Sequence, residues 1–124
     1  MPDLEPVDES WSTALCVVAH PDDLEFGTAA AVARWTDQGK TVVYAMVTSG
    51  EAGIDGMEPE AARSVREAEQ LESARIVGVD TVDFLGLADG VLEYGVGLRR
   101  VICAAVRRHR PEIVITNNFR DTWG

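Results

Sequence analysis

The 124-residue sequence is short of basic residues, cysteine, histidine and long apolar runs. Eleven Lys and Arg residues stand against 21 Asp and Glu residues, and the resulting net charge of −10 repels nucleic acid and anionic membrane surfaces. No stretch approaches the roughly 20 apolar residues of a membrane span, and the acidic first residues lack the basic region of a signal peptide. We therefore expect a cytoplasmic protein without nucleic-acid or membrane partners.

Cysteine and histidine occur twice each. Cys16 lies inside an apolar run and Cys103 on the apolar side of a predicted helix, so both are predicted to be small core residues, and their spacing indicates neither a metal motif nor a disulfide. His109 closes a predicted helix among three arginines, where positive charge suits the helix dipole. We interpret His109 as structural and place it at the sheet edge opposite His20.

Four apolar runs alternate with three helical patterns along the chain. The predicted strands cover 14–19, 41–47, 81–85 and 112–116. The predicted helices cover 21–38, 59–77 and the stretch around 98–106. Strands that alternate with helices form parallel sheets with helices on both faces. We therefore predict an α/β fold, a Rossmann-like three-layer sandwich with a mainly parallel sheet.

The length allows one domain at most, which we assign to residues 13–124, with residues 1–12 as a loose, acidic extension. Helical spacing also predicts which side chains face the sheet. In the first helix these are Phe26, Ala29, Ala30 and Ala33. In the second they are Ala61, Val65, Ala68, Leu71 and Ala74. In the third they are Leu98, Val101, Ile102, Ala105 and Val106.

The polar stretch Ala19-His20-Pro21-Asp22-Asp23-Leu24-Glu25 begins where the first apolar run stops. Proline disfavours the α conformation for the residue before it and suits the first position of a helix, so His20 is predicted to be the N-cap. Asp23 then occupies the third helical position, which faces the capping residue as in a capping box. An imidazole and a carboxylate are therefore expected to converge.

Imidazole nitrogen and carboxylate oxygen are ligands of zinc, and catalytic zinc sites use three protein ligands and an open position. His20 and Asp23 are candidates for two of them. Asp22 projects differently and is a candidate to accept a proton from water at the cation. In the alternative interpretation the acids only complement a helix dipole, and for each residue taken alone this is the commoner situation.

The combination His-Pro-Asp-Asp-Leu-Glu-Phe-Gly resembles the signature of the LmbE-like (PIG-L) family of metal-dependent N-deacetylases, which includes N-acetylglucosaminyl-phosphatidylinositol deacetylases and deacetylases of mycothiol and bacillithiol synthesis. The resemblance, over most of residues 13–124, implies that His20 and Asp23 bind zinc and that Asp22 is the general base. The family takes its third ligand from a later His-Pro-x-Asp-His-like segment. No such segment occurs here, so we expect the domain to be incomplete, with its C-terminal part missing.

The same resemblance implies three substrate contacts. Glu51 ends a Thr-x-Gly-Glu-like segment after the second strand, Arg66 begins an Arg-x-x-Glu pattern in the second helix, and Asp89 belongs to an Asp-Gly pair after the third strand. Each has a structural alternative, respectively a mobile glycine-rich loop, a solvated helix face and a plain turn.

Two functions follow as hypotheses. The first is a zinc-dependent hydrolase that removes an acetyl group from an N-acetylated sugar or related amide, with other divalent metals also compatible with the ligands. The second is a non-catalytic Rossmann-like binding module, or a fragment that needs a second segment to complete its metal site, since fold alone does not imply function. The sequence leaves the exact substrate and homo-oligomer formation open.

Overall fold

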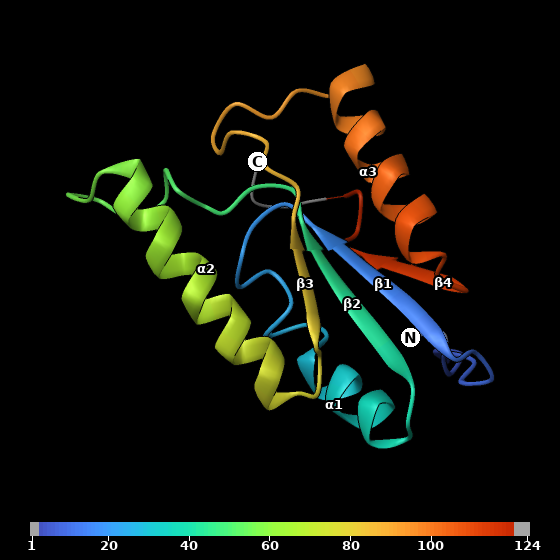
Figure 1. The fold of residues 1–124 in the computed structure, drawn as a ribbon. Helices are drawn as coiled ribbons and strands as arrows, with labels where there is room; N and C mark the ends of the chain where they lie inside the picture. Colours follow the sequence, from blue (N-terminus) through green and yellow to red (C-terminus); the bar gives the residue numbers. More distant parts are fainter. Residues whose placement is uncertain (1–2, 121–124) are drawn as a thin grey trace.

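The structure is a computed structural model that describes residues 3–120 (Figure 1). The strands are β1 (Thr13–Val18), β2 (Thr41–Met46), β3 (Thr81–Phe84) and β4 (Ile113–Thr116). The helices are α1 (Ala29–Asp37), α2 (Pro59–Ile76) and α3 (Val96–His109). The predicted alternation is confirmed, and the strand ends differ from the predicted ones by at most a single residue.

Within residues 3–120, the four strands form one parallel sheet in the order β3-β2-β1-β4. Helices α1 and α2 cover one face of the sheet and α3 covers the other (Figure 1). Crossovers between parallel strands are right-handed, so a chain that moves from β1 to β3 and then returns to the far side of β1 has to place α3 on the opposite face. The predicted three-layer α/β fold is confirmed.

The core consists of two apolar clusters, one on each face of the sheet. Even-numbered residues of β1 and β2 pack with α1 and α2, and odd-numbered residues pack with α3, as the pleat of a strand requires. Trp11 is 5% exposed and packs edge-to-face on Trp35, with ring centroids 5.0 Å apart. The residues immediately before β1 therefore belong to the packed domain.

The first helix begins at Ala29, later than the predicted residue 21. Residues 20–28 form bends and turns, because Asp22 has a left-handed φ of 76°, which an α-helix of L-residues excludes. Phe26 is fully exposed, and Val32 and Trp35 supply the buried side in place of the predicted alanines. The predicted start and packing face of this helix were wrong, whereas its end before Gly39 is confirmed.

Helix α2 begins at the predicted residue 59 and ends one residue before the predicted 77, but it turns a different face to the sheet. Its buried residues are Ala62, Gln70 and Ala74, of which only the last was predicted. Val65 and Leu71 are exposed. The buried face of α2 carries polar groups that reach the loops at the carboxyl edge of the sheet. The prediction from the spacing of apolar residues therefore chose the wrong face of this helix.

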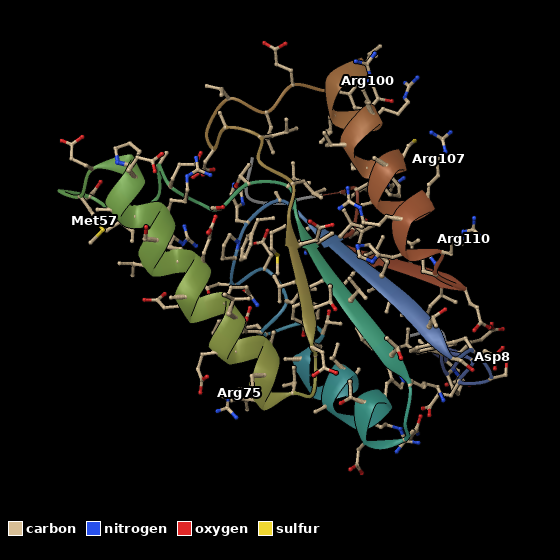
Figure 2. The ribbon with its side chains drawn as sticks, in the orientation of Figure 1. Asp8, Met57, Arg75, Arg100, Arg107 and Arg110 are labelled. Carbon is tan, nitrogen blue, oxygen red and sulfur yellow. The ribbon has the colours of Figure 1, made fainter. Side chains whose placement is uncertain are left out.

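Helix α3 packs on the sheet as predicted, through Leu98, Ile102 and Ala105. Figure 2 shows Arg100 and Arg107 on the outer side, pointing away from the strands. Arg108, by contrast, donates to the carboxylate of Asp83 on β3. His109 Nε2 lies 3.2 Å from Asp83 Oδ2, a pairing consistent with a structural role.

Both cysteines are free thiols. Cys16 is fully buried as predicted, and burial raises the pKa of its thiol to about 12. Cys103 is half-buried. None of the helices within residues 3–120 combines the length and apolar character that crossing a membrane requires.

Candidate active site

Three loops at the carboxyl edge of the sheet, after β1, β2 and β3, form a cleft of about 460 Å³, and α2 contributes one wall. The strand order reverses between β1 and β4, and open α/β sheets bind ligands beside such a reversal. The cleft is lined by His20, Pro21, Asp22, Asp23, Ala52, Gly53, Arg66, Asp89 and Gly90. All the predicted site residues except Glu51 therefore line one cleft.

His20 and Asp23 converge in the loop after β1, although this loop forms turns instead of the predicted helix. His20 Nδ1 lies 3.5 Å from Asp23 Oδ2. The same oxygen accepts the backbone N–H of His20 at 3.1 Å, which corresponds to one half of a capping box. The two side chains are 41% and 33% exposed, so both are accessible from the cleft.

Asp89 contacts the opposite side of the His20 ring. Its Oδ1 lies 2.9 Å from His20 Nε2, and its Oδ2 accepts the backbone N–H of Ala52 at 3.0 Å. The Asp89 side chain is 7% exposed. Both carboxylate oxygens of Asp89 thus contact other groups of the protein. The Asp-Gly turn signal in the sequence did not indicate these contacts.

Asp22 presents its carboxylate to the cleft, with 60% of the side chain exposed. Arg66 Nη2 lies 3.5 Å from Asp22 Oδ2 and donates to the carbonyl of Pro21, while Nη1 donates to the carbonyl of Gly50. Gly50 has a φ of 64°, and a Cβ there would collide with the guanidinium. Arg66 therefore ties the loops after β1 and β2 together beside Asp22.

Two polar residues of α2 that the sequence did not single out hold the loop after β1 from behind. Gln70 is fully buried; its Oε1 accepts the backbone N–H of Asp22 at 3.0 Å and its Nε2 donates to Glu25 Oε1 at 3.2 Å. Ser73 also donates to Glu25 Oε1. No local signal identified Gln70 or Ser73, because an isolated polar residue in a charged helix predicts a solvated face.

Glu51 lies behind the cleft and is 6% exposed. Its Oε2 accepts the backbone N–H of Asp89 at 2.8 Å and its Oε1 accepts that of Ser49 at 3.2 Å, and Arg63 Nη2 lies 3.4 Å from Oε2. Ala52 in turn donates to Asp89, so the loops after β2 and β3 hold each other reciprocally. In this arrangement Glu51 supports the neighbouring loop and is not among the residues that line the cleft.

The environment of Glu51 predicts that the folded protein loses stability at acidic pH. Burial opposes its ionisation, but hydrogen bonds from the backbone N–H of Asp89 and other donors prevail and hold its pKa below 4.5. The unfolded chain then binds more protons, so the stabilisation from Glu51 is present above pH 4.5 and is lost as the pH falls through the folded-state value. In urea unfolding curves, Glu51→Gln is expected to be less stable than wild type near neutral pH and to lose less stability on acidification. Parallel pH profiles for the two proteins would contradict this.

The cleft also fits part of a metal site. Two ligand atoms about 2.1 Å from a tetrahedral cation lie about 3.4 Å apart, which is close to the separation of His20 Nδ1 and Asp23 Oδ2. Imidazole nitrogen and carboxylate oxygen suit zinc and several other divalent ions. Within residues 3–120, no group of three or more His, Cys, Asp and Glu side chains is placed to hold a metal ion. A complete site needs a third ligand from outside these residues.

Comparison with known proteins identifies the family to which this chain is similar. The model of the PIG-L family, described as GlcNAc-PI de-N-acetylase, matches residues 15–123. The diacetylchitobiose deacetylase of Thermococcus kodakarensis is 35% identical over 111 residues, which cover 88% of this chain and 40% of that protein. The chain thus spans less than half the length of this relative.

Solved structures agree with the fold. The N,N'-diacetylchitobiose deacetylase of Pyrococcus horikoshii superposes with a TM-score of 0.81 at 28% identity, over 86% of this chain and 40% of that one. A 4-carboxy-2-hydroxymuconate hydratase from Pseudomonas putida has a TM-score of 0.80 at 23% identity, over 91% of this chain and 50% of that one, and shares the fold alone. Because the match to the family model covers residues 15–123, the chain belongs to the PIG-L family.

Proposed function

We propose that the protein acts as a metal-dependent deacetylase that hydrolyses the acetamide of an N-acetylated sugar or a related amide. The observation that carries the proposal is one cleft that brings His20 Nδ1 and Asp23 Oδ2 to 3.5 Å and leaves the carboxylate of Asp22 exposed beside them. The family match and the relatives named as deacetylases support this reaction class over other chemistry on the same fold.

In this proposal His20 and Asp23 hold a divalent cation, with zinc as the first candidate, and the third ligand comes from outside the described residues. When bound, such a cation polarises a carbonyl and lowers the pKa of water to about 7. Asp22 takes the proton from the attacking water and returns it to the amide nitrogen, so that acetate and a free amine leave. Arg66, beside Asp22, orients that carboxylate and borders the space for the substrate.

Sugar recognition is assigned to the rest of the cleft. Arg66, Gly53 and Gly90 line this part of the cleft, and the two glycines add no side chain to it. Glu51 and Asp89 were also predicted as substrate contacts, but their carboxylate oxygens are engaged by protein donors. We propose that these two acids shape the pocket and do not grip hydroxyl groups.

A test of the reaction is acetate release from a panel of N-acetylated sugars by the full-length protein, measured with and without a chelator. We expect turnover of at least one N-acetylglucosamine derivative, loss of turnover in the chelator and recovery with added zinc. Turnover that persists fully after verified removal of the metal would contradict the metal-dependent mechanism. A panel without acetate release in the metal-loaded protein would contradict the deacetylase assignment.

A non-catalytic binding module is the second candidate, because the described residues supply two ligands at most. Elemental analysis of the purified full-length protein distinguishes the two functions. We expect about one divalent metal ion per chain for the deacetylase. For the module we expect metal at background level. A His20→Ala variant, which removes one proposed ligand, is the matched control and should lose the metal.

A further inference from the structure

We propose that Asp89 is a positioning residue that fixes the tautomer of His20. In this assignment Nε2 carries the proton and donates it to Asp89, which leaves the lone pair of Nδ1 on the side of Asp23. The inference rests on the proposed function in one respect, since the free Nδ1 is taken to serve a cation. The tautomer itself is a property of the metal-free protein.

The distances on the two sides of the ring support this assignment. His20 Nε2 lies 2.9 Å from Asp89 Oδ1, within the range of about 2.7–3.2 Å for an N–H···O hydrogen bond. Nδ1 lies 3.5 Å from Asp23 Oδ2, beyond that range. The geometry therefore places the proton on Nε2. A carboxylate that accepts the second N–H of a ligating histidine is a recurrent device for orienting metal ligands.

Asp89 is itself held in place. Its Oδ2 accepts the N–H of Ala52, and its own N–H donates to Glu51, which Ser49 and Arg63 hold in turn. With 7% of its side chain exposed, Asp89 has little freedom to turn towards a ligand. The loops after β2 and β3 thus present one fixed acceptor to the His20 ring.

An asparagine at this position would reverse the tautomer. The N–H of Ala52 can only donate, so the amide oxygen of the variant has to face it. The amide NH₂ group then faces His20 Nε2, which has to accept, and the ring proton moves to Nδ1. There it points at Asp23 and occupies the lone pair that a cation needs. Asp89→Ala removes the acceptor without adding a donor and leaves both tautomers accessible.

The first experiment measures the tautomer by ¹⁵N NMR of the histidine side chains in the metal-free chain, at about pH 8.5, where an ordinary imidazole is neutral. We expect a protonated Nε2 for His20 in the wild type and a protonated Nδ1 in Asp89→Asn. The matched control is Asp83→Asn, which alters the other Asp–His pair, at His109, and should leave the His20 signals unchanged. An Nε2–H tautomer that persists in Asp89→Asn would overturn the proposal.

The second experiment titrates zinc chloride into the same proteins. We expect affinity to decrease from wild type through Asp89→Ala to Asp89→Asn, with a total loss of about 10–100-fold. A purely structural role predicts the opposite order for the variants, because alanine removes more contacts, so that order would overturn the proposal. If the wild type binds no zinc, the proposed function fails, whereas the NMR measurement still decides the tautomer.

Discussion

Asp22→Asn is expected to lower turnover of an N-acetylated substrate by about 10²–10⁴-fold in the full-length protein, while the protein stays folded and keeps its metal. Asparagine retains the size of the side chain but accepts protons far less readily than a carboxylate. It also tolerates the left-handed φ of 76° at this position, so the backbone should be preserved. Steady-state kinetics with elemental analysis of the same sample measures both properties.

Two further substitutions separate the chemistry of Asp22 from its backbone conformation. Asp22→Gly should be as stable as the wild type or more stable, because glycine adopts positive φ without a steric cost, yet it should be equally inactive. Asp22→Ala should be inactive and less stable, by about 1–2 kcal/mol. Turnover near the wild-type level in the asparagine or glycine variant would remove Asp22 from the mechanism. Loss of metal in the asparagine variant would show that Asp22 acts as a ligand.

The largest effect on stability is expected for Gln70→Leu. Leucine has a similar volume, but it leaves the N–H of Asp22 and the carboxylate of Glu25 without the partners that Gln70 supplies. Glu25 Oε2 already lacks a hydrogen-bond partner within the described structure. Leaving buried polar groups unsatisfied is expected to lower the free energy of unfolding by about 2–4 kcal/mol. Urea unfolding monitored by circular dichroism measures the loss.

A double-mutant cycle identifies the origin of that loss. Replacing both partners of a buried hydrogen bond by apolar groups costs less than replacing one, so Gln70→Leu with Glu25→Leu should be less destabilised than the sum of the single variants. Glu69→Leu, on the exposed side of the same helix, is the control and should change stability by about 0.5 kcal/mol or less. If the stability losses of the two single variants simply add up in the double variant, Gln70 stabilises the protein through packing alone.

Local sequence patterns were sufficient to predict much of the fold and one contact of the candidate site. The strand positions follow from runs of apolar residues, and the parallel order of β1 and β2 follows from the helix between them. The meeting of His20 and Asp23 was also predictable, because it depends on residues three apart. The helix proposed to bring them together is absent from residues 20–28, yet the hydrogen bond from the backbone N–H of His20 to the Asp23 carboxylate closes the same turn.

Other features depended on contacts between distant segments. The start of α1 was predicted too early, because the buried Gln70 on α2 binds the backbone of Asp22, whose left-handed conformation excludes a helix. The packing face of α2 was wrong for a related reason. Its polar side is buried against two loops whose carbonyl and carboxylate groups need donors, and apolar spacing carries no record of that need.

The sequence by itself determined the layers of the fold, the edge of the sheet at which polar residues gather, and one imidazole beside one carboxylate. Each of these depends on residues close together in the chain. Only the tertiary structure decided which atom of the His20 ring meets which acid, and that Glu51 and Asp89 hold each other's loops. The contacts of Asp89 and Glu51 join segments that are separated by whole strands and helices, so their geometry is set by how the layers pack.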